Sequence, residues 1–276
     1  MTMAGMTAIV TGATKGMGVA IAERFAAEGA CVTVSSRSHE DSIRVAADLN
    51  ARFGGGRQIA LGRRCDIESK QDLEQMVTAT LQQWGRIDVL VCNASTLPWF
   101  GPSLETPDGA IDQQFLAVFK TKFWLSNMVI PHMVKQGGGS IVYIASGSVA
   151  EATVERSVYS CVRAAELQLM KNIGAEFGHA NIRVNAISPG MIRSFTTAPL
   201  FADPVTERKY ASSVPMQRGG EPEEIAAAAY FLASKESSYT TGCVITVDGG
   251  RLLHAKPRRL TGALGANATD AKRGLG

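Results

Sequence analysis

The chain has 276 residues, of which 45% are hydrophobic and 19% are charged, and its formal net charge is +3. These values are typical of a globular protein with one large α/β domain or two small ones, and they do not favour nucleic acid or a membrane surface as a partner. No apolar run approaches the roughly 20 residues of a membrane span. No basic segment precedes the first apolar residues, as a secretory signal would require.

The five cysteines are scattered along the chain, and the four histidines show no spacing typical of metal ligands. An odd number of unclustered cysteines indicates reduced thiols rather than a disulfide framework. We therefore expect a cytoplasmic protein without a metal site, acting on a small molecule.

Short apolar, β-branched runs alternate with helix-periodic segments along the chain. Strands are predicted at residues 7–10, 31–34, 59–67, 87–91, 141–144, 182–187 and 244–247. Helices are predicted at residues 19–27, 41–53, 70–83, 110–134, 159–177 and 225–234. This alternation predicts one α/β domain with a doubly wound parallel sheet covered by helices on both faces.

Two segments fall outside that alternation. Residues 191–221 contain several prolines and scattered large apolar side chains, a composition typical of a mobile lid over a site. Residues 254–276 are rich in Gly, Ala, Lys and Arg, which predicts a poorly ordered basic tail. The folded domain is therefore expected at residues 1–253.

A glycine-rich turn at residues 11–18 joins the first strand to the first helix. Glycines let the backbone approach a pyrophosphate closely, and a helix N-terminus supplies N–H donors and a positive dipole. The strand, turn and helix together predict a phosphate cradle; the alternative is a helix start that binds no ligand. The predicted cradle residues are Gly12, Thr14, Lys15, Gly16, Met17 and Gly18.

The residue types at the end of the second strand indicate which dinucleotide would bind. An NAD site usually has Asp or Glu here for the ribose 2′-hydroxyl, but residues 35–38 are Ser-Ser-Arg-Ser. Arg37 and Lys15 offer two cations for a 2′-phosphate, which favours NADP(H). The alternative is that Arg37 is a solvated loop charge. Asp66, at the end of the third strand, could cap the next helix or bind an adenine amino group.

Ser146, Tyr159 and Arg163 form the predicted catalytic group. Ser146 follows a buried strand, and Tyr159 and Arg163 lie four residues apart on one helix face. An ordinary tyrosine has a pKa of about 10, but a cation at ~4 Å and effective dielectric ~20 stabilises a phenolate by about 4 kcal/mol. Such a tyrosine could exchange a proton near pH 7 while Ser146 holds a substrate oxygen. The alternative is a chance pairing of a turn Ser and a helix Tyr.

These features together resemble the short-chain dehydrogenase/reductase family over about residues 6–250. The turn matches the family's TGxxxGxG, residues 92–95 look like a drifted NNAG, and Pro189-Gly190 matches its PG turn. The resemblance implies a Rossmann fold, NAD(P)(H), a catalytic Ser146 and Tyr159, and a homotetramer or homodimer built through paired helices. It adds these expected cofactor-binding residues to Lys15, Arg37 and the glycines: Asp66, Ile67, Asn93, Ala94, Ser95, Pro189, Gly190, Ile192 and Ser194.

Two positions depart from the family pattern. The family has YxxxK, and here Arg163 stands where its Lys would bind the nicotinamide ribose. Arg163 keeps the charge but is larger, planar and always protonated. Val118 stands where a catalytic Asn that holds a relay water is expected. We hypothesise that Lys122, one turn later, partly fills that role.

Three functions are therefore considered. The leading one is an NADP(H)-dependent oxidoreductase that interconverts a carbonyl and an alcohol on a small, apolar substrate. The second is a non-redox enzyme, because a Ser-Tyr-Arg group also occurs in the related halohydrin dehalogenases; it would be an epoxide-forming dehalogenase, a dehydratase or a cyclase. Gly16, where those enzymes would have an aromatic residue, argues against a dehalogenase. The third is a catalytically weak NADP(H)-binding protein.

Overall fold

The computed structural model describes residues 2–194 and 197–253. The tail predicted at residues 254–276 lies outside the described residues. Seven parallel strands form one sheet in the order β3-β2-β1-β4-β5-β6-β7. The strands are β1 (Thr7–Thr11), β2 (Cys31–Ser36), β3 (Ala60–Arg64), β4 (Val89–Cys92), β5 (Gly139–Ile144), β6 (Ile182–Pro189) and β7 (Val244–Val247). The predicted single α/β domain with a doubly wound parallel sheet is confirmed.

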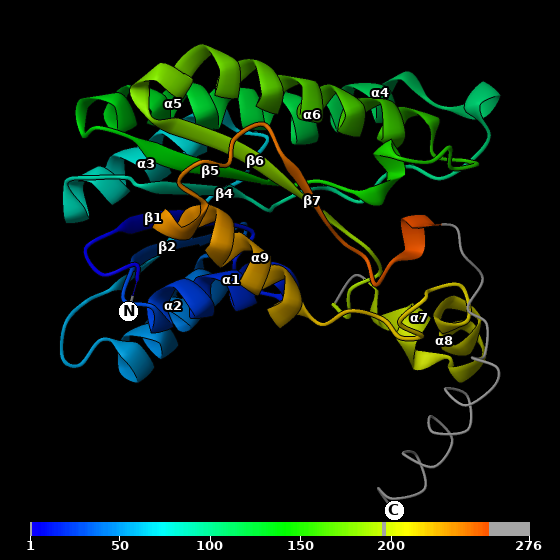
Figure 1. Cartoon of the computed structure of the whole chain (residues 1–276), viewed down its shortest axis with the longest axis horizontal. Coiled ribbons are helices and arrows are strands. Elements are labelled where there is room, and N and C mark those ends of the chain that lie inside the picture. Colours follow the sequence, from blue (N-terminus) through cyan, green and yellow to red (C-terminus); the bar gives the residue numbers. More distant parts are fainter. Residues whose placement is uncertain (1, 195–196, 254–276) are drawn as a thin grey trace, which may run out of the picture.

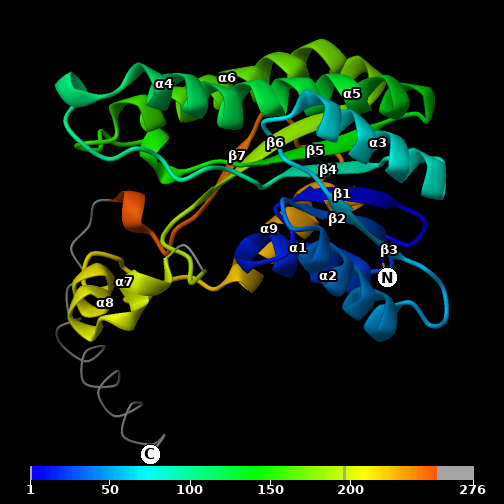
Figure 2. The same cartoon turned by 180° about the vertical axis from the view of Figure 1, so that it is seen from behind.

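Helices cover both faces of the sheet (Figures 1 and 2). One layer contains α1 (Gly16–Ala27), α2 (His39–Phe53) and α9 (Pro222–Ala233), and the other contains α3 (Lys70–Trp84), α4 (Asp108–Gln114), α5 (Thr121–Lys135) and α6 (Ser157–Phe177). A separate apolar core lies on each side of the sheet, around Phe25 and Leu49 on the first side and around Leu90 and Leu125 on the second. Strands buried on both faces explain the continuous apolar runs in the sequence.

Short polar side chains fix where the helices begin. The Ser38 hydroxyl accepts a hydrogen bond from the Asp41 N–H at 3.1 Å, and the Ser69 hydroxyl accepts one from the Asp72 N–H at 3.2 Å. Each satisfies an N–H that has no partner within its own helix. Of the two roles considered for Asp66, the helix cap therefore belongs to Ser69.

The long helix expected at residues 110–134 is interrupted. A π-helical turn at Phe115–Lys120 separates α4 from α5. The Thr121 hydroxyl donates at 2.8 Å to the Ile67 carbonyl and at 3.1 Å to the Leu116 carbonyl. This side chain thus ties the turn to the loop after β3, and π turns occur frequently at functional sites. Val118 lies inside the turn, and Lys122 follows it.

The strand order reverses between β1 and β4, so the loops after these strands diverge and leave a crevice at their carboxyl ends. The segment predicted to be a lid contains two short helices, α7 (Ala198–Ala202) and α8 (Pro204–Ala211). They lie beyond the carboxyl ends of the strands, to the right of the sheet in Figure 1. Within residues 2–194 and 197–253, no helix combines the length and the hydrophobicity needed to cross a bilayer.

Candidate active site

A cavity of about 500 Å³ lies at this edge of the sheet. It is lined by the turn after β1, the ends of β2, β3 and β4, the loop after β5, the first turns of α6 and the segment after β6. Among the predicted site residues, it brings together Gly12, Lys15, Gly16, Met17, Arg37, Asp66, Ile67, Asn93, Ala94, Ser95, Ser146, Tyr159, Arg163, Pro189, Gly190, Ile192 and Ser194. Thr14 and Gly18 do not line it.

The glycine turn is shaped by close backbone contacts. Gly12 has φ = +63°, a conformation that favours glycine. A Cβ on Gly18 would lie 2.2 Å from the Gly12 carbonyl oxygen and 2.5 Å from Asn93 Nδ2. The absence of a side chain at Gly18 therefore allows the turn to pack closely, and Gly18 does not line the cavity.

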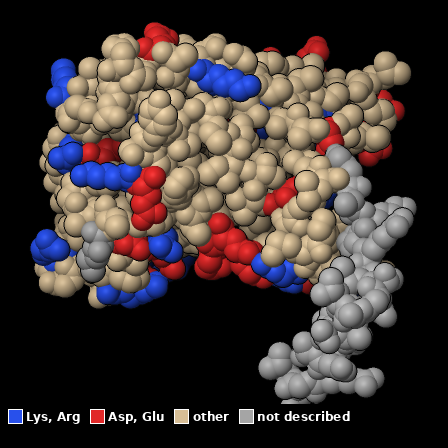
Figure 3. All heavy atoms as spheres, viewed as in Figure 1, with Lys and Arg blue, Asp and Glu red and all other residues tan. Residues whose placement is uncertain are grey.

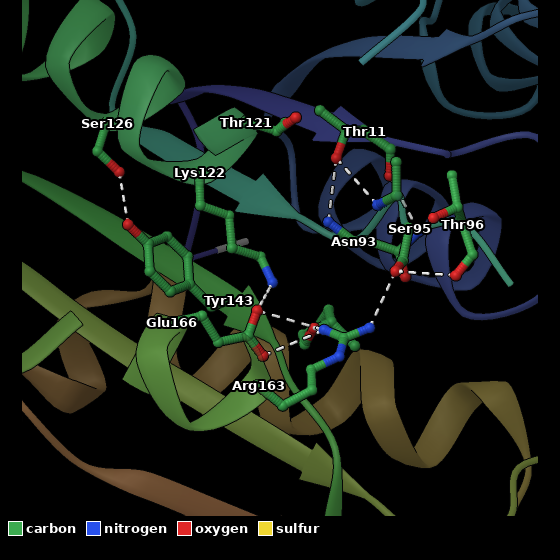
Figure 4. Close-up of polar contacts among 12 residues, drawn as sticks. Thr11, Asn93, Ser95, Thr96, Thr121, Lys122, Ser126, Tyr143, Arg163 and Glu166 are labelled. Carbon is green, nitrogen blue, oxygen red and sulfur yellow. Dashed lines mark hydrogen bonds and ion pairs between the residues drawn. The ribbon is translucent and has the colours of Figure 1, made fainter. Parts of the chain in front are cut away.

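Thr11 of β1 and Asn93, the residue after β4, hold this turn against the neighbouring loop (Figure 4). The Thr11 hydroxyl accepts hydrogen bonds from the Asn93 and Ala94 N–H groups at 3.0 and 3.1 Å. The Asn93 side-chain amide donates to the Thr11 and Gly12 carbonyls at 2.9 and 3.1 Å. Asn93 thus holds the cavity wall as well as lining it.

We expect Gly18→Ala to disrupt this turn, because the new Cβ would overlap the Gly12 carbonyl. Overpacking of this kind costs about 1–3 kcal/mol, and dinucleotide binding should be lost with it. Gly109→Ala is the matched control, since a Cβ there meets nothing within 4 Å. Thermal unfolding and a nucleotide titration of both variants measure the two effects. A Gly18→Ala protein with wild-type stability and binding would contradict this account of the turn.

Ser146 and Tyr159 reach the cavity from two elements. Ser146 follows β5, where its hydroxyl donates to the Ser148 hydroxyl at 3.2 Å and accepts from the Ser148 N–H at 3.3 Å. Tyr159 lies in the first turn of α6, half-buried against the cavity. A hydroxyl and a phenol therefore face the same space.

Arg163 is held under Tyr159 by several acceptors. Its guanidinium carbon lies 5.0 Å from the centre of the Tyr159 ring. Nη1 donates to the Ile144 carbonyl at 3.1 Å and to Glu166, while Nη2 donates to the Ser95 hydroxyl at 3.0 Å. Burial alone would lower the pKa of Arg163, but Glu166 and Tyr159 raise it above its ordinary value. The site therefore holds a fixed cation.

Glu166 and Lys122 complete a buried chain of charges behind Arg163 (Figure 4). Lys122 Nζ forms an ion pair with Glu166 Oε2, and Arg163 Nη1 lies 3.1 Å from Glu166 Oε1. Glu166 was not identified from the sequence. The sequence feature that could have identified it is an acidic residue three positions after Arg163, on a helix face that also carries apolar residues. Lys122 does not line the cavity. Its ammonium group lies next to the Glu166 carboxylate.

Comparisons with known proteins place this chain in a family. Residues 12–251 match a family model described as enoyl-(acyl carrier protein) reductase. The chain is 35% identical over 247 residues to dehydrogenase/reductase SDR family member 4 of Bos taurus, covering 90% of this chain and 87% of that protein. The chain belongs to the short-chain dehydrogenase/reductase family.

Other members of this family extend the likeness. A 4-formylbenzenesulfonate dehydrogenase of Comamonas testosteroni is 34% identical over 251 residues, covering 88% of this chain and 96% of that protein. A 7α-hydroxysteroid dehydrogenase solved with NADH and 7-oxo glycochenodeoxycholic acid superposes with a TM-score of 0.83 at 34% identity, covering 90% of this chain and 94% of its own. A Mycobacterium ulcerans member superposes over all of both chains with a TM-score of 0.87 at 29% identity.

At the entrance of this short-chain dehydrogenase/reductase's cavity, Leu97 and Pro98 form part of the wall. The next two residues, Trp99 and Phe100, do not line it. Phe100 is half exposed, and the Arg156 guanidinium lies 4.6 Å from its ring centre. The apolar wall is therefore aliphatic on this side.

Proposed function

We propose that this chain is an NADP(H)-dependent oxidoreductase that interconverts a carbonyl and an alcohol on a small, apolar substrate. One observation carries the proposal: Ser146 and Tyr159 line the same cavity as the glycine turn. The reacting hydroxyl groups and the phosphate cradle therefore share one space. Dehydrogenases and reductases among the relatives, one of them solved with NADH, support the reaction class.

The residues present fit a dinucleotide. The close approach at Gly12 and Gly18 leaves backbone N–H groups at the N-terminus of α1, where a pyrophosphate is stabilised by the helix dipole. Asp66 and Ile67 would lie beside the adenine. Asn93, Ala94 and Ser95 would follow the ribose, and Pro189, Gly190, Ile192 and Ser194 would border the nicotinamide.

In this assignment the chain's own groups handle the substrate oxygen and its proton. When bound, the nicotinamide would supply or accept the hydride. The Ser146 hydroxyl donates a hydrogen bond that orients the carbonyl oxygen. Tyr159 gives its phenolic proton to that oxygen during reduction and takes it back during oxidation. The Arg163 cation stabilises the negative charge that remains on the phenol.

The 2′-phosphate preference is supported by two cations, Arg37 after β2 and Lys15 in the turn after β1. Arg37 and Lys15 line the cavity, and the Asp41 carboxylate nearby receives a hydrogen bond from Arg44 at 3.1 Å. We expect Arg37→Ala to weaken NADPH binding about tenfold and to leave NADH binding unchanged, because a charge-assisted hydrogen bond would be lost. Arg44→Ala is the matched control, since Arg44 does not line the cavity. Fluorescence titrations with both nucleotides measure the ratio; an unchanged ratio in Arg37→Ala would reject the assignment.

A non-redox reaction is the second candidate, and the donors of Arg163 favour it. Nη1 and Nη2 already donate to the Ile144 carbonyl, Glu166 and the Ser95 hydroxyl, which reduces the number of donors that remain for a ribose hydroxyl, while Nε has no hydrogen-bond partner among the described residues. Tyr159 could then act on a vicinal hydroxyl in an epoxide-forming elimination, a dehydration or a cyclisation. Product formed without added nicotinamide would establish this candidate over the first. Tight NADPH binding without turnover on a broad carbonyl panel would instead indicate a catalytically weak NADP(H)-binding protein.

We also infer a cytoplasmic homotetramer or homodimer. Charged side chains are sparser over α5 and α6 than over the layer of α1, α2 and α9 (Figure 3). Phe115 and Phe123 are 41% and 43% exposed on the π turn and α5. An apolar helical face of this kind supports pairing with a second copy.

A further inference from the structure

Three charged side chains lie side by side in the interior behind the catalytic group. Lys122 from α5 is 2% exposed, Glu166 from α6 is fully buried, and Arg163 from α6 is 4% exposed. Figure 4 shows the Glu166 carboxylate between the Lys122 ammonium and the Arg163 guanidinium. Buried charges are costly unless they are paired, and here positive, negative and positive charges alternate.

The order of these charges determines the electrostatic potential at Tyr159. Arg163 is the member nearest to Tyr159, with its guanidinium carbon 5.0 Å from the ring centre. Arg163 and Glu166 by themselves form a neutral pair. Lys122, on the far side of Glu166, supplies the charge that leaves the group with a net value of +1.

The surrounding titratable groups add no charge near neutral pH. From β4, burial raises the pKa of the Cys92 thiol to about 12. From β5, burial raises the pKa of Tyr143 well above its ordinary value, and its hydroxyl lies 2.6 Å from that of Ser126. Burial, as the largest influence, lowers the pKa of Lys122, while Glu166 opposes this. The net charge beneath Tyr159 thus depends on the three members of the chain.

We propose that Glu166 and Lys122 are positioning residues for Tyr159. Glu166 holds the Arg163 guanidinium in place, and Lys122 offsets the carboxylate so that one net positive charge remains to stabilise the phenolate. The inference rests on the proposed role of Tyr159 as proton donor and acceptor. It gives Lys122 an electrostatic role that does not require contact with the cavity.

The proposal predicts the direction in which the removal of each charge shifts the titration midpoint of Tyr159. Lys122→Met leaves a neutral pair under Tyr159, so the phenol should titrate at higher pH than in the wild type. Glu166→Gln leaves two cations, so the phenol should titrate at lower pH. The double variant leaves Arg163 alone with a net charge of +1, and its midpoint should return toward that of the wild type.

The measurement is a pH titration of the full chain labelled with ¹³Cζ-tyrosine, followed by NMR. The chain has five tyrosines, and Tyr159→Phe identifies the Tyr159 resonance by its loss. Lys120→Met is the matched control, because it removes an exposed lysine whose Nζ lies 5.5 Å from the Trp124 ring centre, outside the chain of charges. The control should leave the Tyr159 midpoint unchanged.

The outcomes separate this inference from the proposed function, because the titration needs neither substrate nor cofactor. Equal midpoints in wild type and Lys122→Met overturn the inference, even if Tyr159→Phe abolishes turnover. Midpoints that shift in the predicted directions, in a protein that turns over no carbonyl or alcohol, support the inference and reject the proposed function. If Glu166→Gln does not fold, Lys122→Met and the double variant still decide, since a double variant that keeps the Lys122→Met midpoint contradicts the proposal.

Discussion

Turnover of a carbonyl substrate should fall by about 10²–10⁴-fold in Tyr159→Phe, the range that general acid–base catalysis contributes, while NADPH binding should stay intact. The change removes one oxygen and keeps the ring that lies over Arg163. The proposed proton donor for the substrate oxygen is lost, but the glycine turn and the end of β2 are untouched. NADPH oxidation on a substrate that the wild type reduces measures the first effect, and fluorescence titration measures the second.

Tyr239→Phe is the control for this experiment, because Tyr239 is fully exposed and lies outside the cavity. It should retain wild-type turnover. Near-normal turnover in Tyr159→Phe would reject the catalytic assignment and the mechanism built on it. Loss of NADPH binding in the same variant would indicate that Tyr159 holds the cofactor rather than moving a proton.

Glu166→Gln should lower the free energy of unfolding by about 3–5 kcal/mol, the usual cost of removing one partner of a buried ion pair. Glu166 has no exposed surface and contacts both Lys122 and Arg163. Its loss leaves two buried cations facing one another. Urea unfolding of wild type and variant measures the change.

Combining Glu166→Gln with Lys122→Met should recover part of this loss, because one of the two unpaired cations is then removed. Arg163 would keep its bonds to the Ile144 carbonyl and the Ser95 hydroxyl. Glu74→Gln is the control: Glu74 lies 4.0 Å from Lys70 in an exposed pair, which contributes little to stability. Strictly additive losses from the two single changes would show that Lys122 and Glu166 are not coupled.

Local patterns were sufficient to predict most of the fold. Apolar runs bounded by turn residues located each of the seven strands to within a few residues, because strands of a parallel sheet are buried on both faces. The glycine spacing predicted the turn after β1, since backbone crowding there excludes a Cβ. These features depend on neighbours close in sequence.

Other features depended on groups far apart in the chain. The π turn inside the predicted long helix is joined to the Ile67 carbonyl through Thr121, a contact across 54 positions. Glu166 lies three residues after Arg163 in the sequence, but only the tertiary structure reveals that it pairs with Lys122. Lys122 was singled out for its place on a helix face, but its partner could not be predicted.

The sequence by itself determined the parallel α/β sheet, the glycine-rich turn at Gly12 and the spacing that brings Ser146 and Tyr159 to one edge. The hydrophobic period and the glycine geometry depend on a few neighbouring residues, so they can be recognised in the sequence. The tertiary structure alone decided that Glu166 and Lys122 lie behind Arg163. Burial of Lys122, Glu166 and Arg163 together is possible only because the π turn, α5 and α6 exclude water and place opposite charges in contact, where each offsets the cost of burying the next.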